Sequence, residues 1–268
     1  MIECVHTGAT AERARVVLFD FDGTLSLIRS GWAQVMVPMM VEVLEDLGSG
    51  ETRTQLGALV DEYVMRLNGK QTIYQMIELA DQVRRRGGAP KKPLEYKRIY
   101  LDRLHERIAG RLRELREGAC APEKYLVPGA RELLLALRER GLRLFLASGT
   151  DEPYMRDEAR LLGVEQLFDG GVFGALDDYR SFSKALLIER IIASAECRGE
   201  ELLAFGDGYV EIQNTKQVGG VAVGVATAEP ECRVVDEWKR RRLIGVGADY
   251  IVPNFLDGEE LMGALFPS

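Results

Sequence analysis

Five short, mostly apolar runs set the strongest limit on how this chain can fold. They cover residues 16–19, 142–147, 202–205, 221–225 and 250–252. Runs without polar alternation are typical of strands buried on both faces, as in a parallel sheet. Helical patterns lie between them, over residues 130–140, 153–163, 183–195 and 230–243. This alternation predicts an α/β fold, a parallel sheet with right-handed crossovers and helices on both faces.

The stretch between the first run and residue 124 interrupts this alternation, because it carries helical patterns and no strand pattern. Apolar residues at helical spacing from Tyr96 to Leu115 predict one amphipathic helix, and residues 72–86 predict another. A more apolar pattern covers residues 32–47, where Pro38 is expected to kink or split the helix. We therefore predict a core domain of residues 1–28 and 125–268, and an inserted all-helical domain of residues 29–124.

Composition and charge exclude several classes of partner. Asp and Glu number 42 against 35 Lys and Arg, a net charge of −7, so no nucleic-acid partner is expected. The two basic runs, residues 84–86 and 239–242, come late in helical segments and are interpreted as solvated faces. No apolar stretch is long enough for a membrane span, and the first twenty residues lack the apolar segment of a secretory signal. We therefore predict a cytoplasmic protein without a membrane partner.

Cysteine and histidine usage excludes several chemistries. The four cysteines are far apart and form no C-x-x-C pair, so neither a zinc site nor a disulfide framework is expected. With only His6 and His105, a Ser-His-Asp mechanism or a multi-histidine metal site is not expected either. Any reaction must therefore depend on carboxylates, hydroxyls and lysine.

Two carboxylates follow directly on the first apolar run, in the segment Asp20-Phe21-Asp22-Gly23-Thr24. In open parallel sheets, ligand sites lie beyond the carboxyl ends of the strands. Two carboxylates brought together in an apolar setting need a compensating cation, and Mg²⁺ is the natural candidate. An aspartate-glycine turn after a strand is common, however, so this motif alone is a weak signal.

Three further signals fall at predicted strand ends or helix starts. A hydroxyl and a glycine, Ser148 and Gly149, follow the second run and suit the binding of an anion. Lys184 opens a helix, where a cation is poorly placed for the helix dipole, although an isolated lysine is usually an ordinary surface residue. Asp207 and Glu211 follow the third run. Because all these groups are expected at one edge of the sheet, together they predict a single site.

Four parts of the sequence resemble, in the same order, the four motifs of the haloacid dehalogenase-like (HAD) superfamily. They are LFDFDGTL, LASGT, a single lysine and GDGYVE. The resemblance covers nearly the whole chain, and the helical insert is similar to a C1-type cap domain. It implies a Rossmann-like core and the activity of phosphoglycolate phosphatase-like members, which hydrolyse phosphate monoesters of small metabolites. Glu211 stands where aspartate is commoner in this superfamily, which should only lengthen a contact to metal-bound water.

The resemblance also implies a role for each site residue. Asp20 would be the nucleophile that forms an aspartyl-phosphate, and Asp22 the general acid and base. Mg²⁺ would be held by the Asp20 carboxylate, the Asp22 backbone carbonyl and Asp207, with Glu211 orienting its waters. The phosphoryl oxygens would be bound by four residues: Gly23, Ser148, Gly149 and Lys184.

The helical insert is expected to choose the substrate, a small phosphorylated metabolite. Arg29, where the chain enters the insert, is a candidate contact to the leaving group, and a solvated arginine is the alternative. The methionines Met36, Met39 and Met40 are more typical of a core than of a pocket. The oligomeric state is expected to be monomer or homodimer.

Two other functions stay open at this point. A β-phosphoglucomutase-like phosphomutase would use the same two aspartates and return the phosphoryl group to a bound sugar. A non-enzymatic protein that binds a phosphorylated ligand would keep the fold without turnover, but all the expected catalytic side chains are present.

Overall fold

The structure is a computed structural model, and it describes residues 2–176 and 183–267. The chain divides into two compact units, one of Met1–Ser30 with Leu112–Ser268 and the other of Gly31–Arg111. The first unit contains the sheet and the second is helical.

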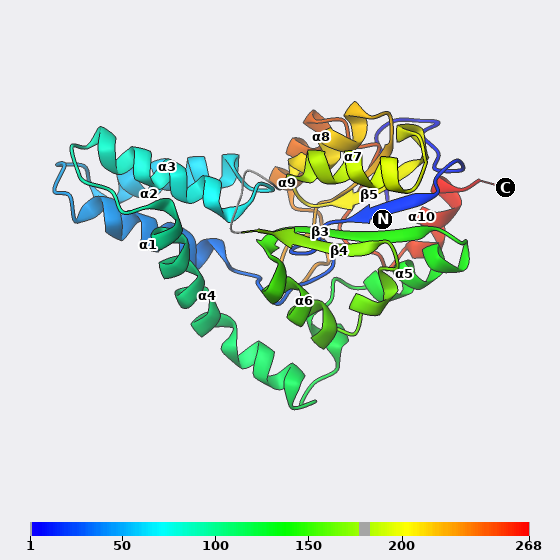
Figure 1. Cartoon of the computed structure of the whole chain (residues 1–268), viewed down its shortest axis with the longest axis horizontal. Helices are drawn as coiled ribbons and strands as arrows, with labels where there is room; N and C mark the ends of the chain where they lie inside the picture. Colours follow the sequence, from blue (N-terminus) through cyan, green and yellow to red (C-terminus); the bar gives the residue numbers. More distant parts are fainter. Residues whose placement is uncertain (1, 177–182, 268) are drawn as a thin grey trace. The chain divides into compact units, whose positions relative to one another are not determined.

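The sheet of the first unit has, in the described residues, seven strands in the order β1-β7-β6-β5-β2-β3-β4 (Figure 1). The strands are β1 (Glu3–Cys4), β2 (Val16–Phe19), β3 (Arg143–Asp151), β4 (Gly171–Ala175), β5 (Leu202–Gly206), β6 (Val221–Val225) and β7 (Tyr250–Val252). All neighbouring pairs are parallel except β1 with β7. The predicted parallel sheet is therefore confirmed. The sequence patterns missed β1, which has only two residues, and β4, in which glycine interrupts the apolar pattern.

Helices cover both faces of this sheet, as predicted: in Figure 1, α7 and α8 lie on one face and α5 and α6 on the other. The helices of this unit are α5 (Ala130–Glu139), α6 (Glu152–Leu161), α7 (Lys184–Ser194), α8 (Tyr209–Gln217), α9 (Glu237–Gly245) and α10 (Gly258–Leu265), with short 3-10 turns η1 (Pro122–Tyr125), η2 (Glu165–Leu167) and η3 (Gly199–Glu201). The helix predicted over 230–243 begins later, at Glu237, because Thr227 and Val235 pair across a loop.

The helical insert lies between β2 and β3 in the chain. Its helices are α1 (Ala33–Glu45), α2 (Arg53–Arg66), α3 (Thr72–Arg85) and α4 (Pro93–Arg116). Pro38 lies inside α1 and does not split it. Met36, Met39 and Met40 are buried, which agrees with a core role for these methionines. Among the described helices of the whole chain, none combines the length and the apolar character needed to cross a membrane.

An aromatic pair forms the part of the sheet core directly below the predicted site. Phe19 at the end of β2 lies opposite Phe205 on β5, and their rings stack with centroids 4.5 Å apart. Both side chains are fully buried. Because Asp20 and Asp207 follow shortly after these two residues, the stack fixes the points at which both carboxylates leave the sheet.

We expect Phe205→Ala to lower the free energy of unfolding by about 3–5 kcal/mol, because it empties a buried site in the middle of the sheet. Equilibrium unfolding in urea measures this change. The control is Leu135→Ala on α5, where the side chain is 44% exposed, and there the change should stay within about 0.5 kcal/mol. Similar losses of unfolding free energy in the two variants would show that the Phe19–Phe205 stack does not stabilise the core.

Candidate active site

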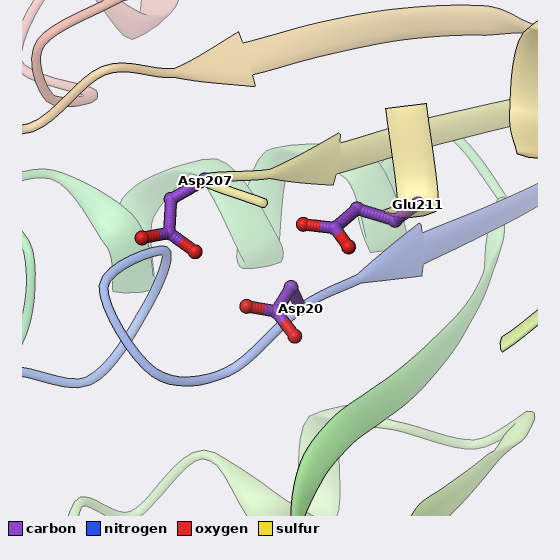
Figure 2. Close-up of side chains that lie close together, drawn as sticks. All are labelled: Asp20, Asp207 and Glu211. Carbon is purple, nitrogen blue, oxygen red and sulfur yellow. The ribbon is translucent and has the colours of Figure 1, made fainter. Parts of the chain in front are cut away.

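Three carboxylates from separate parts of the chain meet at the carboxyl edge of the sheet. Asp20 follows β2, Asp207 follows β5, and Glu211 lies in the first turn of α8. Each offers an oxygen atom, and these atoms all lie within 4.8 Å of one another. Figure 2 shows the three carboxylates turned toward one another. We call these residues the acidic triad.

Lys184 lies against this triad. It is the first residue of α7, whose N-terminus is capped by the side chain of Ser183. Its Nζ atom is 2.5 Å from Asp20 Oδ1 and 2.9 Å from Glu211 Oε2, and all three side chains are buried. The structure therefore brings together the lysine and three of the four carboxylates that the sequence motifs singled out.

Burial and neighbouring charge set the ionisation of these groups. Burial raises the pKa of Asp20 well above its usual range; Glu211 and Asp207 raise it further, and Lys184 opposes both effects. For Lys184, burial disfavours the charged form, but Asp20 and Glu211 outweigh burial and raise its pKa. Lys184 therefore stays positively charged beside the carboxyl groups of Asp20 and Glu211.

A second lysine is buried at the same edge. Lys239 Nζ lies 2.9 Å from Asp207 Oδ2 and 3.0 Å from Glu229 Oε1, and only 9% of the residue is exposed. The interpretation of residues 239–242 as a solvated face is therefore wrong at Lys239. Burial opposes the charge of Lys239 too, but the two carboxylates outweigh it and raise its pKa.

The sequence does carry a signal for Lys239. Lys239 lies in the first turn of α9, the same unfavourable place for a cation that drew attention to Lys184. The predicted start of this helix at residue 230 put Lys239 well inside the helix and hid the signal. Glu229 lies in the loop before the helix and had no signal of its own.

The charges at this edge suit a divalent cation. The acidic triad and Glu229 supply four carboxyl groups against two lysines, so the acidic groups outnumber the lysines by two. Carboxylate oxygens are hard ligands of the kind that Mg²⁺ prefers. Glu211, expected to act only through metal-bound water, lies among the groups able to bind a metal directly.

Gly23 allows the loop after β2 to approach these acids. Its φ angle is +75°, and a Cβ atom there would lie 2.5 Å from Asp207 Oδ2 and 3.1 Å from Glu229 Oε1. The neighbouring Thr24 accepts a hydrogen bond from the Asp207 backbone N–H at its Oγ1 atom, at 2.9 Å. The loops after β2 and β5 are therefore fastened together, and glycine is required at position 23.

The Asp22 carboxylate is held by hydroxyl groups at the end of β3. Its Oδ2 atom accepts hydrogen bonds from Thr150 Oγ1 at 2.8 Å and from Ser148 Oγ at 3.2 Å. Its Oδ1 atom is buried and has no hydrogen-bond partner among the described residues. Ser148 and Gly149 were predicted site residues, and the structure places both on β3. Thr150 was not predicted to be one, although it belongs to the same segment.

Arg29 is buried rather than solvated. Its Nε atom is 3.0 and 3.1 Å from the two carboxylate oxygens of Glu158 on α6, and its Nη2 atom is 2.7 Å from Glu158 Oε1. Its Nε atom also lies 3.8 Å from Asp22 Oδ1. The solvated alternative for Arg29 is therefore wrong, and its contact with a leaving group stays a prediction. Glu158, in the middle of a helix, had no sequence signal.

Removal of the arginine tests this buried pair. Burial raises the pKa of Glu158, and Arg29 opposes that rise. We expect Arg29→Met to lower the free energy of unfolding at pH 7.5 by about 3–5 kcal/mol, because it leaves a buried carboxylate unpaired. The loss should shrink as the pH falls toward 5, since Glu158, with its pKa raised further, then takes up a proton in the folded state.

Urea unfolding at several pH values measures this dependence, and Arg29→Met with Glu158→Gln is the control. The double variant has no charge at position 158, so most of the stability should return, without the pH dependence that Glu158 causes. An equal loss in Arg29→Met at every pH would contradict this account of the pair.

Comparison with solved structures gives the same fold. A predicted phosphoglycolate phosphatase from Haemophilus somnus 129PT is 18% identical, with 93% of this chain and 98% of that chain covered and a TM-score of 0.59. A phosphonoacetaldehyde hydrolase-like protein from Oleispira antarctica is 14% identical, with 96% and 94% covered and a TM-score of 0.62. A HAD family hydrolase from Deinococcus radiodurans R1 with bound phosphate and sodium is 17% identical, with 96% and 100% covered and a TM-score of 0.55.

Comparison by sequence gives the family. The search of curated proteins found no match. The haloacid dehalogenase-like hydrolase family matches residues 14–219, a stretch that includes the acidic triad and Lys184. Because that match covers well over half of its residues, the chain belongs to the haloacid dehalogenase-like hydrolases.

Proposed function

We propose that the protein is a Mg²⁺-dependent phosphatase that hydrolyses a phosphate monoester of a small metabolite through an aspartyl-phosphate on Asp20. The observation that carries this proposal is Lys184 buried between Asp20 and Glu211, with Asp207 beside them. The family is one of hydrolases, and similar structures include a predicted phosphoglycolate phosphatase and a hydrolase with bound phosphate. These relatives support a phosphate ester as the substrate.

The metal would be held by the carboxylates of Asp20 and Asp207 and the backbone carbonyl of Asp22. Glu211 would bind the metal directly or orient its waters. Bound Mg²⁺ supplies positive charge that stabilises the phosphoryl oxygens as charge develops on them. It would also favour the ionised form of Asp20, whose pKa burial raises in its absence.

Asp20 then acts as the nucleophile. A carboxylate oxygen of Asp20 attacks phosphorus, and the bond from phosphorus to the ester oxygen breaks. The leaving oxygen takes a proton from Asp22, and the product alcohol departs. In the second step Asp22 accepts a proton from water, whose oxygen attacks phosphorus, breaks the bond to Asp20 and forms inorganic phosphate.

Hydroxyl groups would orient Asp22 for both proton transfers. Thr150 and Ser148 both donate to Oδ2, which fixes the orientation of the carboxyl group. Ser148 has one hydroxyl proton, so when it turns to a phosphoryl oxygen Thr150 still holds Asp22. The phosphoryl oxygens would be bound by Gly23, Ser148, Gly149 and Lys184, as the resemblance implies.

The helical insert would act as the cap. A cap that covers bound substrate excludes water and contacts the leaving group, so it would determine which metabolite phosphate is accepted. We propose residues 29–124 for this role, in a cytoplasmic enzyme that works as a monomer or homodimer.

Release of inorganic phosphate from a panel of metabolite phosphates, including phosphoglycolate and sugar phosphates, tests the proposal. Activity should require Mg²⁺, and Asp20→Asn should lower kcat by at least about 10³-fold, because it removes the nucleophile. The control Asp81→Asn changes an aspartate on α3 that is 42% exposed, and it should keep full activity. Substantial turnover in Asp20→Asn would contradict the mechanism.

Asp22→Asn should lower kcat by about 10²–10⁴-fold, because it removes the group that moves the proton in both steps. Rapid quenching in acid with a ³²P-labelled substrate measures the phosphorylated protein in this variant. Product analysis separates the alternatives: an isomerised sugar phosphate without phosphate release would indicate a phosphomutase. Tight ligand binding without turnover would indicate a binding protein.

A further inference from the structure

Lys239 occupies a place that is unfavourable for a lysine in two ways. It lies in the first turn of α9, where its backbone N–H donates to the capping Asp236 side chain and the helix dipole repels a cation. Its ammonium group is also buried, which removes most of its hydration. Neither feature stabilises α9. The carboxylates that Lys239 contacts therefore explain why a lysine lies at this position.

These carboxylates are Asp207 and Glu229, which are held differently. Asp207 belongs to the acidic triad, and its backbone N–H is fixed by Thr24. Glu229 lies in a loop closed at its base by a hydrogen bond from the Asp236 backbone N–H to the carbonyl oxygen of Ala226, at 2.8 Å. Lys239 therefore connects a member of the acidic triad to a separate, closed loop.

The charges of Lys239 and Glu229 cancel. As a pair they add no net charge beside Asp207, so an overall electrostatic attraction for a metal ion does not explain them. What the pair does supply is an ammonium group fixed beside Asp207, 2.9 Å from its Oδ2 atom. Carboxylates that bind metals are themselves oriented by neighbouring polar groups.

We propose that Lys239, anchored by Glu229, is a positioning residue that fixes the Asp207 carboxylate for binding of the divalent cation. One Asp207 oxygen is occupied by the ammonium group, which leaves the other for the metal. This inference rests on the metal site of the proposed function, and it adds two residues that the four sequence motifs do not contain.

A charge-neutral double variant tests positioning apart from charge. Lys239→Met with Glu229→Gln removes one positive and one negative group together. We expect it to bind Mg²⁺ about 10–100-fold more weakly in calorimetric titration of the whole protein with MgCl₂ alone. The matched control is Lys124→Met with Glu114→Gln, another Lys–Glu pair with Nζ and oxygen 2.6 Å apart but exposed, and its affinity should not change.

The single variant Lys239→Met does not depend on the folding of the double variant. Charge alone predicts tighter Mg²⁺ binding in this variant, because a cation is lost, whereas positioning predicts weaker binding. Lys239→Arg keeps the charge and the donors and should recover most of the affinity. Thermal unfolding without metal shows whether each variant retains its fold.

The outcomes separate the two proposals. If the unaltered protein binds Mg²⁺ and Lys239→Met binds it equally or more tightly, Lys239 only competes with the metal, and the positioning role is overturned while the proposed function stands. If the unaltered protein binds no Mg²⁺, the metal site fails and both proposals fail with it. Weaker binding in Lys239→Met and the double variant, with the control unchanged, supports the positioning role.

Discussion

The crowding of carboxylates at one buried edge of the sheet is the constraint on which the rest of this site depends. Carboxylates taken out of water repel one another, and their charged forms are costly unless cations lie among them. Two lysines supply these cations: Lys184 lies between Asp20 and Glu211, and Lys239 forms an ion pair with Asp207. Both lysines come from the first turn of a helix that begins at this edge. The acidic groups outnumber the lysines, and this excess makes the edge suited to holding a metal ion.

Strand register and the packing below the site bring the acidic residues together. Parallel register sets Phe19 against Phe205, and the stacked rings hold the ends of β2 and β5 level. The carboxylates after these strands then leave the sheet side by side. Gly23 lets the first loop lie close to the second, where any larger residue would collide with Asp207. A protein interior packed in this way is rigid, and this rigidity suits a site whose chemistry depends on fixed distances.

The sequence predicted the site residues that lie next to a strong local signal, such as the end of a buried strand or the start of a helix. Asp20 and Asp207 directly follow buried strands, and Lys184 opens a helix, so topology alone places them together. Lys239 required the correct start of α9, which depends on a loop closed by tertiary hydrogen bonds rather than on helical periodicity. Glu158 had no local signal, because a glutamate in the middle of a helix is common and only the fold pairs it with an arginine. The same reason explains the strands: continuous apolar runs were found, and the two-residue β1, which has no apolar run, was not.

The two lysines also bear on how the chain reaches its folded state. Many metal sites are assembled from groups that repel one another until the ion arrives, so folding must wait for the metal supply. Here Lys184 and Lys239 already lie among the acids, so the folded core does not depend on a metal ion to separate them.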